Sequence, residues 1–369
     1  MAEKSAAAVI IAPREFEIRE FDLPDIPPDG GLLRIERCGI CGSDVHGYDR
    51  MGEGVRIMGH ENLGWVAKIG SEASKRWGVK EGDRVAVEEY VPCGSCELCR
   101  TGYPRFCPQT SSFGHTGENP RLWYGSTPID VEPALWGGYS QYMYMHPGAM
   151  VHKVPDHVDA SEAAFFLPFS NGYEWAVEYG GASIGKTVVV QGPGQQGLAA
   201  VIAAREAGAS MIIVSGMGHD EHRLEIARRM GADYTVDVEA EDLVEKVMQY
   251  TGGHGADVVV NVTGGGRETV KEGIDMAAFN AVVCLPAAGN ETISVGGTGR
   301  KNLTMKWCHG HSYRSVERAI STIASGRYPI KEIVTHHFGL KDLKYAIDSV
   351  GGIGAPGAIH VSIDPWMDL

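Results

Sequence analysis

From about residue 160 onward, short apolar runs alternate with longer segments that have the period of a helix. A strand buried on both faces of a parallel sheet reads as a continuous apolar run, and an amphipathic helix returns to the core every three or four residues. The strands and helices expected from this pattern are, in chain order, Thr187–Gln191, Gly197–Ala207, Met211–Ser215, His222–Met230, Asp257–Val262 and Ala281–Leu285. Such alternation predicts a parallel, doubly wound α/β sheet in this part of the chain.

Residues 1–155 show a different pattern, in which short β-like runs are separated by Gly, Pro and Asp. Examples of these runs and turns are Phe16–Arg19, Gly31–Glu36, Gly64–Ile69 and Glu81–Asp83. Short strands with frequent turn signals predict a β-rich, barrel-like unit. The C-terminal part combines an amphipathic helix with strand-like runs, at Ser315–Ser325, Ile333–His337 and Ala358–Ile363.

A stretch rich in Gly, Pro and aromatic residues lies between Cys107 and the strand-like run Tyr139–Met145. Loops of this length in a compact domain are usually functional or disordered, and the aromatic side chains favour an ordered flap. We expect residues 108–138 to cover a substrate cleft, to form an oligomer contact, or to pack as a surface loop.

Composition narrows the setting of these patterns. The chain has 369 residues, which is enough for two domains that each have a core. Its formal net charge of −14 is unlike the basic footprint of proteins that bind nucleic acid or anionic membranes. No apolar run approaches the ~18 residues of a membrane span, and the apolar part of the N-terminal segment is too short for a signal peptide. We therefore expect a cytoplasmic protein with neither a nucleic-acid nor a membrane partner.

Four cysteines are separated by gaps of only two, two and seven residues, at Cys93, Cys96, Cys99 and Cys107. Four thiolates can close a tetrahedron around one zinc ion and leave no position for substrate, so the spacing predicts a structural zinc site over residues 93–107. The alternatives are a reduced loop without metal and a pair of disulfides. Disulfides are disfavoured because nothing marks the chain as secreted. The remaining cysteines are scattered, at Cys38, Cys41, Cys284 and Cys308.

A G-x-G-x-x-G motif directly follows the predicted strand over 187–191 and opens the predicted helix after it. In this context the motif indicates a dinucleotide site, and each glycine has a physical task. Gly192 permits the tight turn, Gly194 lets the pyrophosphate approach the backbone, and Gly197 lets the helix pack closely on the strand. The phosphates are then expected at the positive N-terminus of the helix. The alternative is a glycine-rich turn without a ligand.

The residues expected near the ribose leave the choice between NAD and NADP open. An acidic residue near the tip of the second strand usually binds the ribose 2′-hydroxyl, but here the strand ends at Ser215 without a carboxylate. Asp220 can fold back to the ribose, which favours NAD. Ser215, His219 and Arg223 can instead receive the 2′-phosphate of NADP. We favour NAD, because Asp220 and Glu221 would repel a phosphate.

Two further segments complete the set of motifs: Cys38–His46, which reads Cys-Gly-Ile-Cys-Gly-Ser-Asp-Val-His, and Gly59–Asn62, which reads Gly-His-Glu-Asn. Together with the four-cysteine lobe and the glycine motif, they resemble the zinc-containing medium-chain alcohol dehydrogenases over essentially the whole chain. The resemblance implies a GroES-like barrel catalytic domain with an inserted doubly wound Rossmann domain, and a homodimer or homotetramer. The expected boundaries are 1–160 for the catalytic domain, 161–305 for the dinucleotide-binding domain and 306–369 for the return to the catalytic domain.

The resemblance also assigns catalytic roles to the matching positions of this chain. Cys41 and His60 would bind a catalytic zinc, and Glu61 would be the adjacent carboxylate, able to approach the metal. Ser43 would hydrogen-bond the substrate alcohol, and His46 would pass the proton of that alcohol to solvent. In this chemistry zinc polarises the alcohol or carbonyl oxygen, and hydride passes between the carbon and the nicotinamide.

The position of the family's third zinc ligand departs from the pattern. Matching Phe169–Tyr173 to the family's Phe-Ser-x-Gly-Tyr places Leu167 at that position, and a leucine cannot bind metal. Neither Asn171 nor Glu174 is a ready replacement. Two hypotheses follow: a zinc held by the other three residues, or a site that has lost its metal.

The predicted function is that of an NAD(P)-dependent alcohol dehydrogenase or carbonyl reductase, acting on a small alcohol, ketone or aldehyde. An alternative is a reductase of the same fold without catalytic zinc, which acts on an activated C=C or C=O bond with Ser43, His46 or a residue of the 108–138 loop as proton donor. A third hypothesis is a nucleotide-binding protein without catalysis, against which the Ser43 and His46 pair argues.

Overall fold

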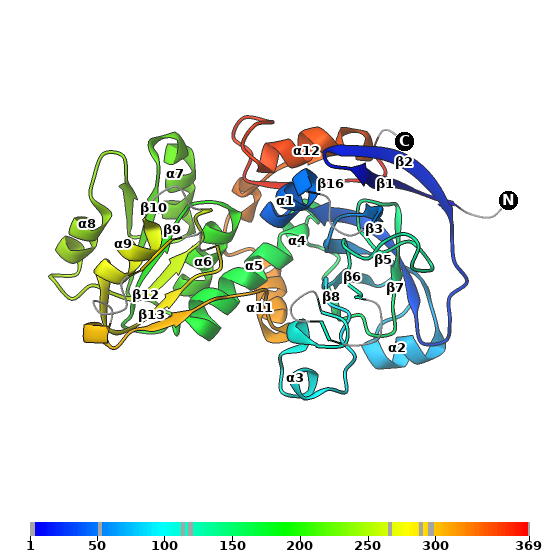
Figure 1. Cartoon of the computed structure of the whole chain (residues 1–369), viewed down its shortest axis with the longest axis horizontal. Helices are drawn as coiled ribbons and strands as arrows, with labels where there is room; N and C mark the ends of the chain where they lie inside the picture. The colour runs from blue at the N-terminus through cyan, green and yellow to red at the C-terminus, as the bar shows by residue number, and fades with distance from the viewer. Residues whose placement is uncertain are drawn as a thin grey trace. The chain divides into compact units, whose positions relative to one another are not determined.

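The computed structural model describes residues 4–50, 54–111, 115–116, 121–264, 268–287, 291–293 and 299–367. Its contacts divide the chain into two compact units. Unit 1 comprises Met1–Leu167, Ile320–Ser325 and Val334–Leu369, and unit 2 comprises Pro168–Ala319 and Gly326–Ile333. Figure 1 shows the helices and strands of the whole chain, coloured along the sequence. Among the described residues, the structure has no helix with the length and apolar character needed to cross a bilayer.

Unit 2 contains a parallel sheet, which has six strands within the described residues. The strands are β9 (Thr187–Gln191), β10 (Met211–Gly216), β11 (Tyr234–Asp237), β12 (Ala256–Asn261), β13 (Ala277–Cys284) and β14 (Thr304–Lys306). Their order is β11-β10-β9-β12-β13-β14, and every neighbouring pair is parallel. The order runs outward from β9 in both directions, so the carboxyl end of β9 is the topological switch point where ligands bind in such sheets.

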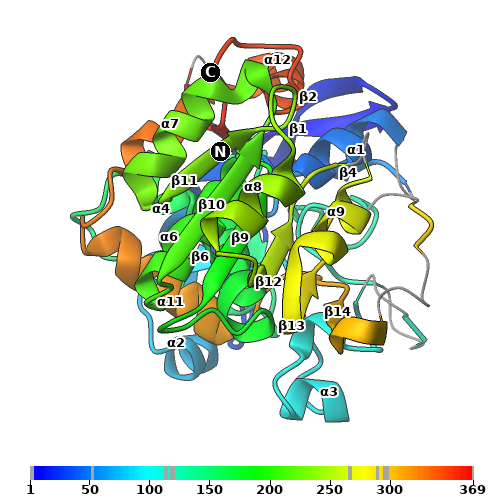
Figure 2. The same ribbon diagram turned by 90° about the vertical axis from the view of Figure 1, so that its left-hand side faces the viewer.

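Helices cover both faces of this sheet. The elements are α6 (Gln195–Glu206), η3 (Gly218–Asp220), α7 (Glu221–Met230), α8 (Leu243–Tyr250), α9 (Thr269–Met276), η4 (Gly299–Lys301) and η5 (Ile330–Glu332). Helix α6 contacts α7, whereas α8 contacts α9, and Figure 2 shows α8 and α9 on the side of the sheet that faces the viewer. The doubly wound fold predicted from the alternating pattern is confirmed, with the ends of elements shifted by a few residues.

Four further elements lie close to, or include, the points in the sequence where one unit passes into the other. They are α4 (Ala160–Ala164), α5 (Phe166–Tyr173), a π-helical turn (η2, Glu174–Tyr179) and α11 (Tyr313–Ala324). Helix α11 confirms the amphipathic helix predicted from residue 315 to residue 325.

Unit 1 is built around β3, which is antiparallel to the strands it pairs with, whereas β15 and β16 are parallel. Its strands are β1 (Lys4–Ala12), β2 (Glu15–Asp22), β3 (Gly31–Gly39), β4 (Arg56–Ile57), β5 (Glu61–Ile69), β6 (Arg84–Val87), β7 (Tyr142–Met145), β8 (Val151–Lys153), β15 (Val334–Phe338) and β16 (His360–Ile363). One sheet has the order β2-β1-β4, and a second has the order β15-β16-β3-β5-β6-β8 with β7 paired to β3. The GroES-like β-rich fold expected for this part is confirmed, and its C-terminal strand β16 pairs directly with β3.

Short helices connect the strands of unit 1. They are α1 (Gly42–Arg50), α2 (Ser71–Trp77), α3 (Glu97–Arg100), η1 (Pro104–Phe106), η6 (Leu340–Asp342) and α12 (Leu343–Val350). Helix α1 was not expected from the sequence pattern.

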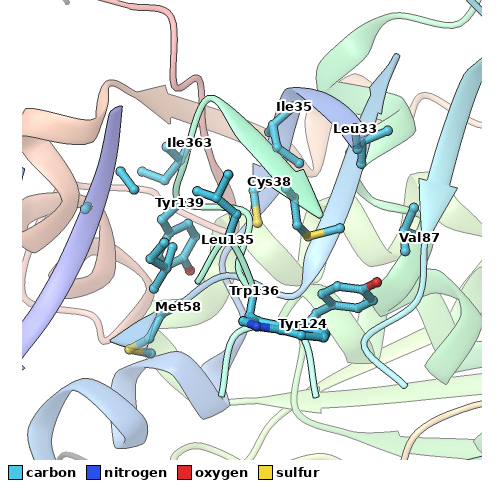
Figure 3. Packing of buried hydrophobic residues seen from close by; sticks show 14 of the residues in the cluster. Leu33, Ile35, Cys38, Met58, Val87, Tyr124, Leu135, Trp136, Tyr139 and Ile363 are labelled. Carbon is cyan, nitrogen blue, oxygen red and sulfur yellow. The ribbon is translucent and has the colours of Figure 1, made fainter. Parts of the chain in front are cut away.

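Side chains of the predicted loop over residues 108–138 contribute to the core of unit 1. Tyr124, Leu135 and Trp136 are buried in the same cluster as Tyr139 (Figure 3). The rings of Tyr124 and Trp136 have centroids 5.9 Å apart, and Trp136 meets Tyr144 edge-on at 5.5 Å. This part of the loop is therefore ordered core structure and fits the packed-loop alternative. Residues 112–114 and 117–120, which the flap hypothesis also included, lie outside the described residues.

Candidate functional site

The candidate metal site begins at the first turn of α1. Cys41 directly precedes this helix, and its backbone N–H donates to Oδ2 of Asp44 at 2.9 Å. The N–H of Asp44 donates in return to the carbonyl of Cys41 at 3.0 Å. A side chain that bonds back to the residue before the helix forms half of a capping box, which fixes the start of the helix. Cys41 is therefore held rigidly at the helix end.

Asp44 also controls the orientation of His60. Its Oδ1 lies 3.3 Å from Nδ1 of His60, and its Oδ2 accepts a hydrogen bond from Oη of Tyr139 at 3.1 Å. Burial and the charge of Asp44 raise the pKa of Tyr139, so the phenol keeps its proton for this bond. When a carboxylate takes Nδ1–H of an imidazole, Nε2 is left with a lone pair for a metal. Sequence reasoning missed Asp44, although its place three residues after Cys41 at a helix start was a usable signal.

The electrostatics of this cluster favour a cation. Burial lowers the pKa of the His60 imidazole, but the Asp44 carboxylate and the Cys41 sulfur outweigh burial and hold that pKa well above its usual range. A raised histidine pKa means that the surrounding groups stabilise positive charge at this point. A bound metal ion supplies such a charge in place of the proton.

Glu61, the first residue of β5, adds a third donor atom. Cys41, His60 and Glu61 each offer a ligand atom, and these atoms all lie within 4.8 Å of one another. Glu61 is fully buried, and within the described structure its Oε1 has no hydrogen-bond partner. A sulfur, an imidazole nitrogen and a carboxylate oxygen are ligands that zinc accepts, and three protein ligands leave a fourth position for substrate. The residues present therefore fit a catalytic zinc.

The structure offers no fourth ligand from the segment that follows Phe166. Leu167 is buried, and its side chain is apolar. The Oε2 of Glu174 accepts hydrogen bonds from the backbone N–H and the hydroxyl of Ser312, at 3.1 and 2.6 Å. The Oδ1 of Asn171 lies 3.1 Å from Nδ1 of His311. Glu174 and Asn171 are thus engaged elsewhere, in agreement with the expectation that neither replaces the missing ligand.

The predicted proton-transfer residues lie on one side of α1. Ser43 and His46 are exposed, whereas Asp44 between them is buried. Residues three apart on a helix are neighbours on its surface, so the hydroxyl and the imidazole share a face of α1 that solvent reaches. This placement suits a relay of protons to water.

The four-cysteine lobe has the geometry of a closed zinc site. Sγ of Cys96 lies 3.4 Å from Sγ of Cys99 and 4.0 Å from Sγ of Cys107, and Sγ of Cys93 lies 4.0 Å from that of Cys99. A tetrahedron with Zn–S bonds of ~2.3 Å requires sulfurs about 3.8 Å apart. All four cysteines are free of disulfide bonds, so the disulfide alternative is wrong. This lobe is the structural zinc site.

Hydrogen bonds reach several of the sulfur atoms of this lobe and favour the thiolate form at Cys93. Backbone N–H groups donate to Sγ of Cys96 and to Sγ of Cys107, from Cys99 at 3.5 Å and from Cys93 at 3.4 Å. Desolvation raises the pKa of Cys93, but hydrogen bonds from the Ser95 hydroxyl and the backbone outweigh it and lower this pKa to about 6. Thiolates are the form that binds zinc.

The glycine motif has the predicted backbone geometry in unit 2. Gly192 has φ of 102°, which a residue with a side chain rarely adopts. A Cβ on Gly197 would lie 1.9 Å from the carbonyl oxygen of Gly192, so helix and turn require a glycine here. A Cβ on Gly194 would meet open space, and this residue precedes α6 without capping it by a side chain. The helix N-terminus thus offers space and partial positive charge for a phosphate.

The residues expected at the ribose form a compact turn after β10. Ser215 is buried in β10. Asp220 folds back onto its own turn, where its Oδ2 accepts a hydrogen bond from the N–H of Met217 at 3.2 Å. Its Oδ1 lies 3.2 Å from Nη1 of Arg223, and the side chain of His219 is largely exposed. Asp220 and Arg223 therefore offset one another's charge at the position where a ribose or a phosphate would bind.

Sequence reasoning missed two further carboxylates near this turn, those of Glu239 and Asp237. The N–H of Gly218 donates to Oε2 of Glu239 at 2.8 Å, and a Cβ on Gly218 would lie 3.3 Å from Oδ2 of Asp237. Both acidic residues come from the end of β11 and the residues after it. They lie close to the turn after β10 because β11 is paired with β10. No local sequence motif indicates this proximity.

Known dehydrogenases are similar to this chain over nearly its whole length. Residues 27–156 match the family described as "Alcohol dehydrogenase GroES-like domain" and residues 197–325 the family described as "Zinc-binding dehydrogenase". The chain is 37% identical over 337 residues to a "Probable alcohol dehydrogenase adh" of Mycobacterium tuberculosis, which covers 89% of each chain. It is 30% identical to an "Erythritol/L-threitol dehydrogenase" of Mycolicibacterium smegmatis, over 98% of each chain. The crystal structure of an alcohol dehydrogenase from Thermotoga maritima superposes with a TM-score of 0.84 at 27% identity, over 98% of this chain and 99% of that one.

Replacing Cys96 by Ser is expected to open the tetrahedral lobe and to lower the zinc content by about one ion per chain, because the closed site loses one of its four ligands. The melting temperature should fall with it. Metal analysis and thermal unfolding measure both effects, and Cys284→Ser, outside the lobe, serves as the control that keeps its zinc. Full zinc content and an unchanged melting temperature in Cys96→Ser would contradict the assignment.

Replacing Gly194 by Val is expected to raise the Kd for NADH and NADPH about tenfold or more, which corresponds to about 1.4 kcal/mol. The valine side chain would occupy the open space where the pyrophosphate is expected, while the protein alone has room for it. Gly197→Ala is the matched contrast, since its Cβ would clash with Gly192 and should lower the melting temperature as well. Fluorescence titration with both nucleotides tests the expectation, and equal affinities in Gly194→Val and wild type would show that the phosphates bind elsewhere.

Proposed function

This chain belongs to the zinc-containing medium-chain alcohol dehydrogenase family, whose members act on CH–OH groups with NAD(P), and on that premise we propose that it oxidises a secondary hydroxyl of a small polyol with NAD. The observation that carries the proposal is the cluster of Cys41, His60 and Glu61, whose ligand atoms lie within 4.8 Å of one another. Within the described residues, the buried Oε1 of Glu61 has no hydrogen-bond partner. The polyol class is supported by the relative named for erythritol and L-threitol.

The proposed mechanism divides the work among residues of unit 1. When bound, zinc supplies a Lewis acid that lowers the pKa of the substrate hydroxyl, and the nicotinamide accepts the hydride. Asp44 keeps Nε2 of His60 available as a ligand by holding Nδ1. Ser43 would relay the proton of the substrate hydroxyl, accepting it at Oγ while passing its own hydroxyl proton on towards His46. His46, on the same exposed face of α1, would release a proton to water. Reduction of the ketone uses the same residues in the reverse direction.

The preference for NAD is supported by the charges around the turn after β10. Asp220 lies within this turn, and Glu239 accepts the N–H of Gly218 at its centre. A 2′-phosphate would have to approach these carboxylates, whereas the 2′-hydroxyl of NAD can donate a hydrogen bond to either one. Arg223 is already paired with Asp220, which lowers its value as a phosphate partner.

A second candidate function is favoured by one observation, the apolar Leu167 at the position of the usual third ligand. In that case the catalytic zinc is absent, and the enzyme reduces an activated C=C or C=O bond with Ser43 or His46 as proton donor. Zinc content per chain and activity after mild chelation separate the two functions.

The proposed function predicts about two zinc ions per chain, with the catalytic zinc bound more weakly because it has three protein ligands and the lobe has four. Mild chelation should remove one ion and abolish polyol oxidation, while the structural zinc and the melting temperature change little. Leu167→Cys should slow this chelation by supplying a further ligand. Leu167→Ser, which makes a similar cavity but offers a poorer ligand, is the matched control. A fully active wild type with one zinc, confined to residues 93–107, would overturn the metal-assisted mechanism in favour of the second function.

A further inference from the structure

Three neighbouring strands of unit 1 bring Glu61 and His360 together. Gly39, at the end of β3, is paired with Glu61 of β5 on one side and with Ser362 of β16 on the other. Residues paired across strands present their side chains on the same face of a sheet, and so do residues two apart along one strand. Glu61 and His360 therefore share a face, with β3 between their strands.

The absence of a side chain on Gly39 lets these two residues meet. A Cβ on Gly39 would stand 2.0 Å from Oε2 of Glu61 and 2.9 Å from Nε2 of His360. With only hydrogen there, Nε2 of His360 lies 3.3 Å from Oε2 of Glu61, and both side chains are buried. The missing side chain of Gly39 thus leaves the space in which Glu61 and His360 make contact across β3.

We propose that His360 is a positioning residue for the metal site, which holds one carboxylate oxygen of Glu61 so that the other is presented as the third protein ligand. This inference rests on the proposed function and names a residue on which its metal site depends. The imidazole of His360 donates its Nε2 proton to Oε2 of Glu61, and Oε1 is then the oxygen directed to the metal.

The two oxygens of Glu61 differ in the way this role requires. Oε2 faces the imidazole, whereas Oε1 is buried and has no hydrogen-bond partner within the described residues. Buried carboxylate oxygens normally have a partner. Because the ligand atoms of Cys41, His60 and Glu61 lie within 4.8 Å of one another, a cation at their centre supplies the partner that Oε1 lacks.

His360 is itself fixed by its surroundings. Its ring meets the ring of Phe165 edge-on, with centroids 5.4 Å apart and planes at 75°. Its carbonyl accepts a hydrogen bond from Oγ1 of Thr335 at 3.3 Å. The imidazole therefore provides a rigid hydrogen-bond donor to Glu61. The orientation of Glu61 is more important here than in a site that has a further metal ligand at the position of Leu167.

The test compares His360→Ala with His360→Gln, which keeps an N–H donor on a side chain of similar reach. Competition with a chromophoric chelator measures the Kd of each zinc, and the absorption of cobalt substituted at the weaker site reports its ligand geometry. His360→Ala is expected to raise the Kd of the weaker zinc about 10- to 100-fold, as loss of an outer-shell partner typically does. The zinc of the four-cysteine lobe should bind as in wild type, and His360→Gln should regain most of the affinity.

Gly39→Ala gives an independent check, because its Cβ would displace Oε2 of Glu61 without altering either residue of the pair. It should weaken the same zinc and leave the lobe unaffected. Should His360→Ala fail to fold, His360→Asn, whose shorter side chain cannot reach Glu61, is compared with His360→Gln. A Kd for the weaker zinc within about twofold of wild type in His360→Ala, or in His360→Asn if that is the pair used, overturns the inference. A wild type that binds zinc only in the lobe overturns the proposed metal mechanism itself, so the two failures are distinguishable.

Discussion

The hydrogen bonds of one buried carboxylate, that of Asp44, organise the candidate metal site. Its Oδ2 accepts hydrogen bonds from the backbone N–H of Cys41 and from the hydroxyl of Tyr139, and its Oδ1 faces Nδ1 of His60. A buried carboxylate is tolerated only where donors replace water, so its partners must stay in place as long as the fold does. The two candidate metal ligands Cys41 and His60 are thereby held by the same carboxylate.

The structural zinc site and the proposed catalytic zinc site achieve their geometry in different ways. The lobe over residues 93–107 uses four ligands of one kind from one short segment, and the backbone between them supplies the supporting N–H donors. The cluster at Cys41 combines three kinds of ligand atom and relies on support from Asp44 and His360, which lie on other elements or turns. Metal binding at a closed site stabilises the fold. An open site keeps one coordination position for substrate, so its ligands depend on neighbouring residues for their orientation.

This difference explains what the sequence could predict. Spacing alone revealed the lobe, and the strand, glycine motif and helix around Gly192 were evident because each has a local physical requirement. Cys41, His60 and Glu61 were recognised as candidate ligands because the short motifs that contain them resemble those of a known family. Asp44 was overlooked, since helix α1 was not predicted and its capping role was not apparent.

His360 and Glu239 could not be found from local patterns. His360 lies 299 residues from Glu61 and meets it only through the register of three strands. Glu239 reaches the turn after β10 because β11 is the neighbouring strand. The fate of the loop over 108–138 was equally open from the sequence, because aromatic residues suit a flap and a core alike. In the described part, Tyr124 packs against Trp136, and Trp136 packs against Tyr144.

The pairing of β16 with β3 also bears on the order in which the protein can mature during synthesis. Domains generally fold as units while the chain emerges from its N-terminal end. Here residues 168–319, which belong to unit 2, are made between β3 and the strand that completes its sheet. Cys41, His60 and the lobe cysteines all leave the ribosome before unit 2 does, yet the contact between His360 and Glu61 can form only after unit 2 has been synthesised. A nascent chain can thus acquire its structural zinc and its nucleotide-binding fold well before the surroundings of its catalytic centre are complete.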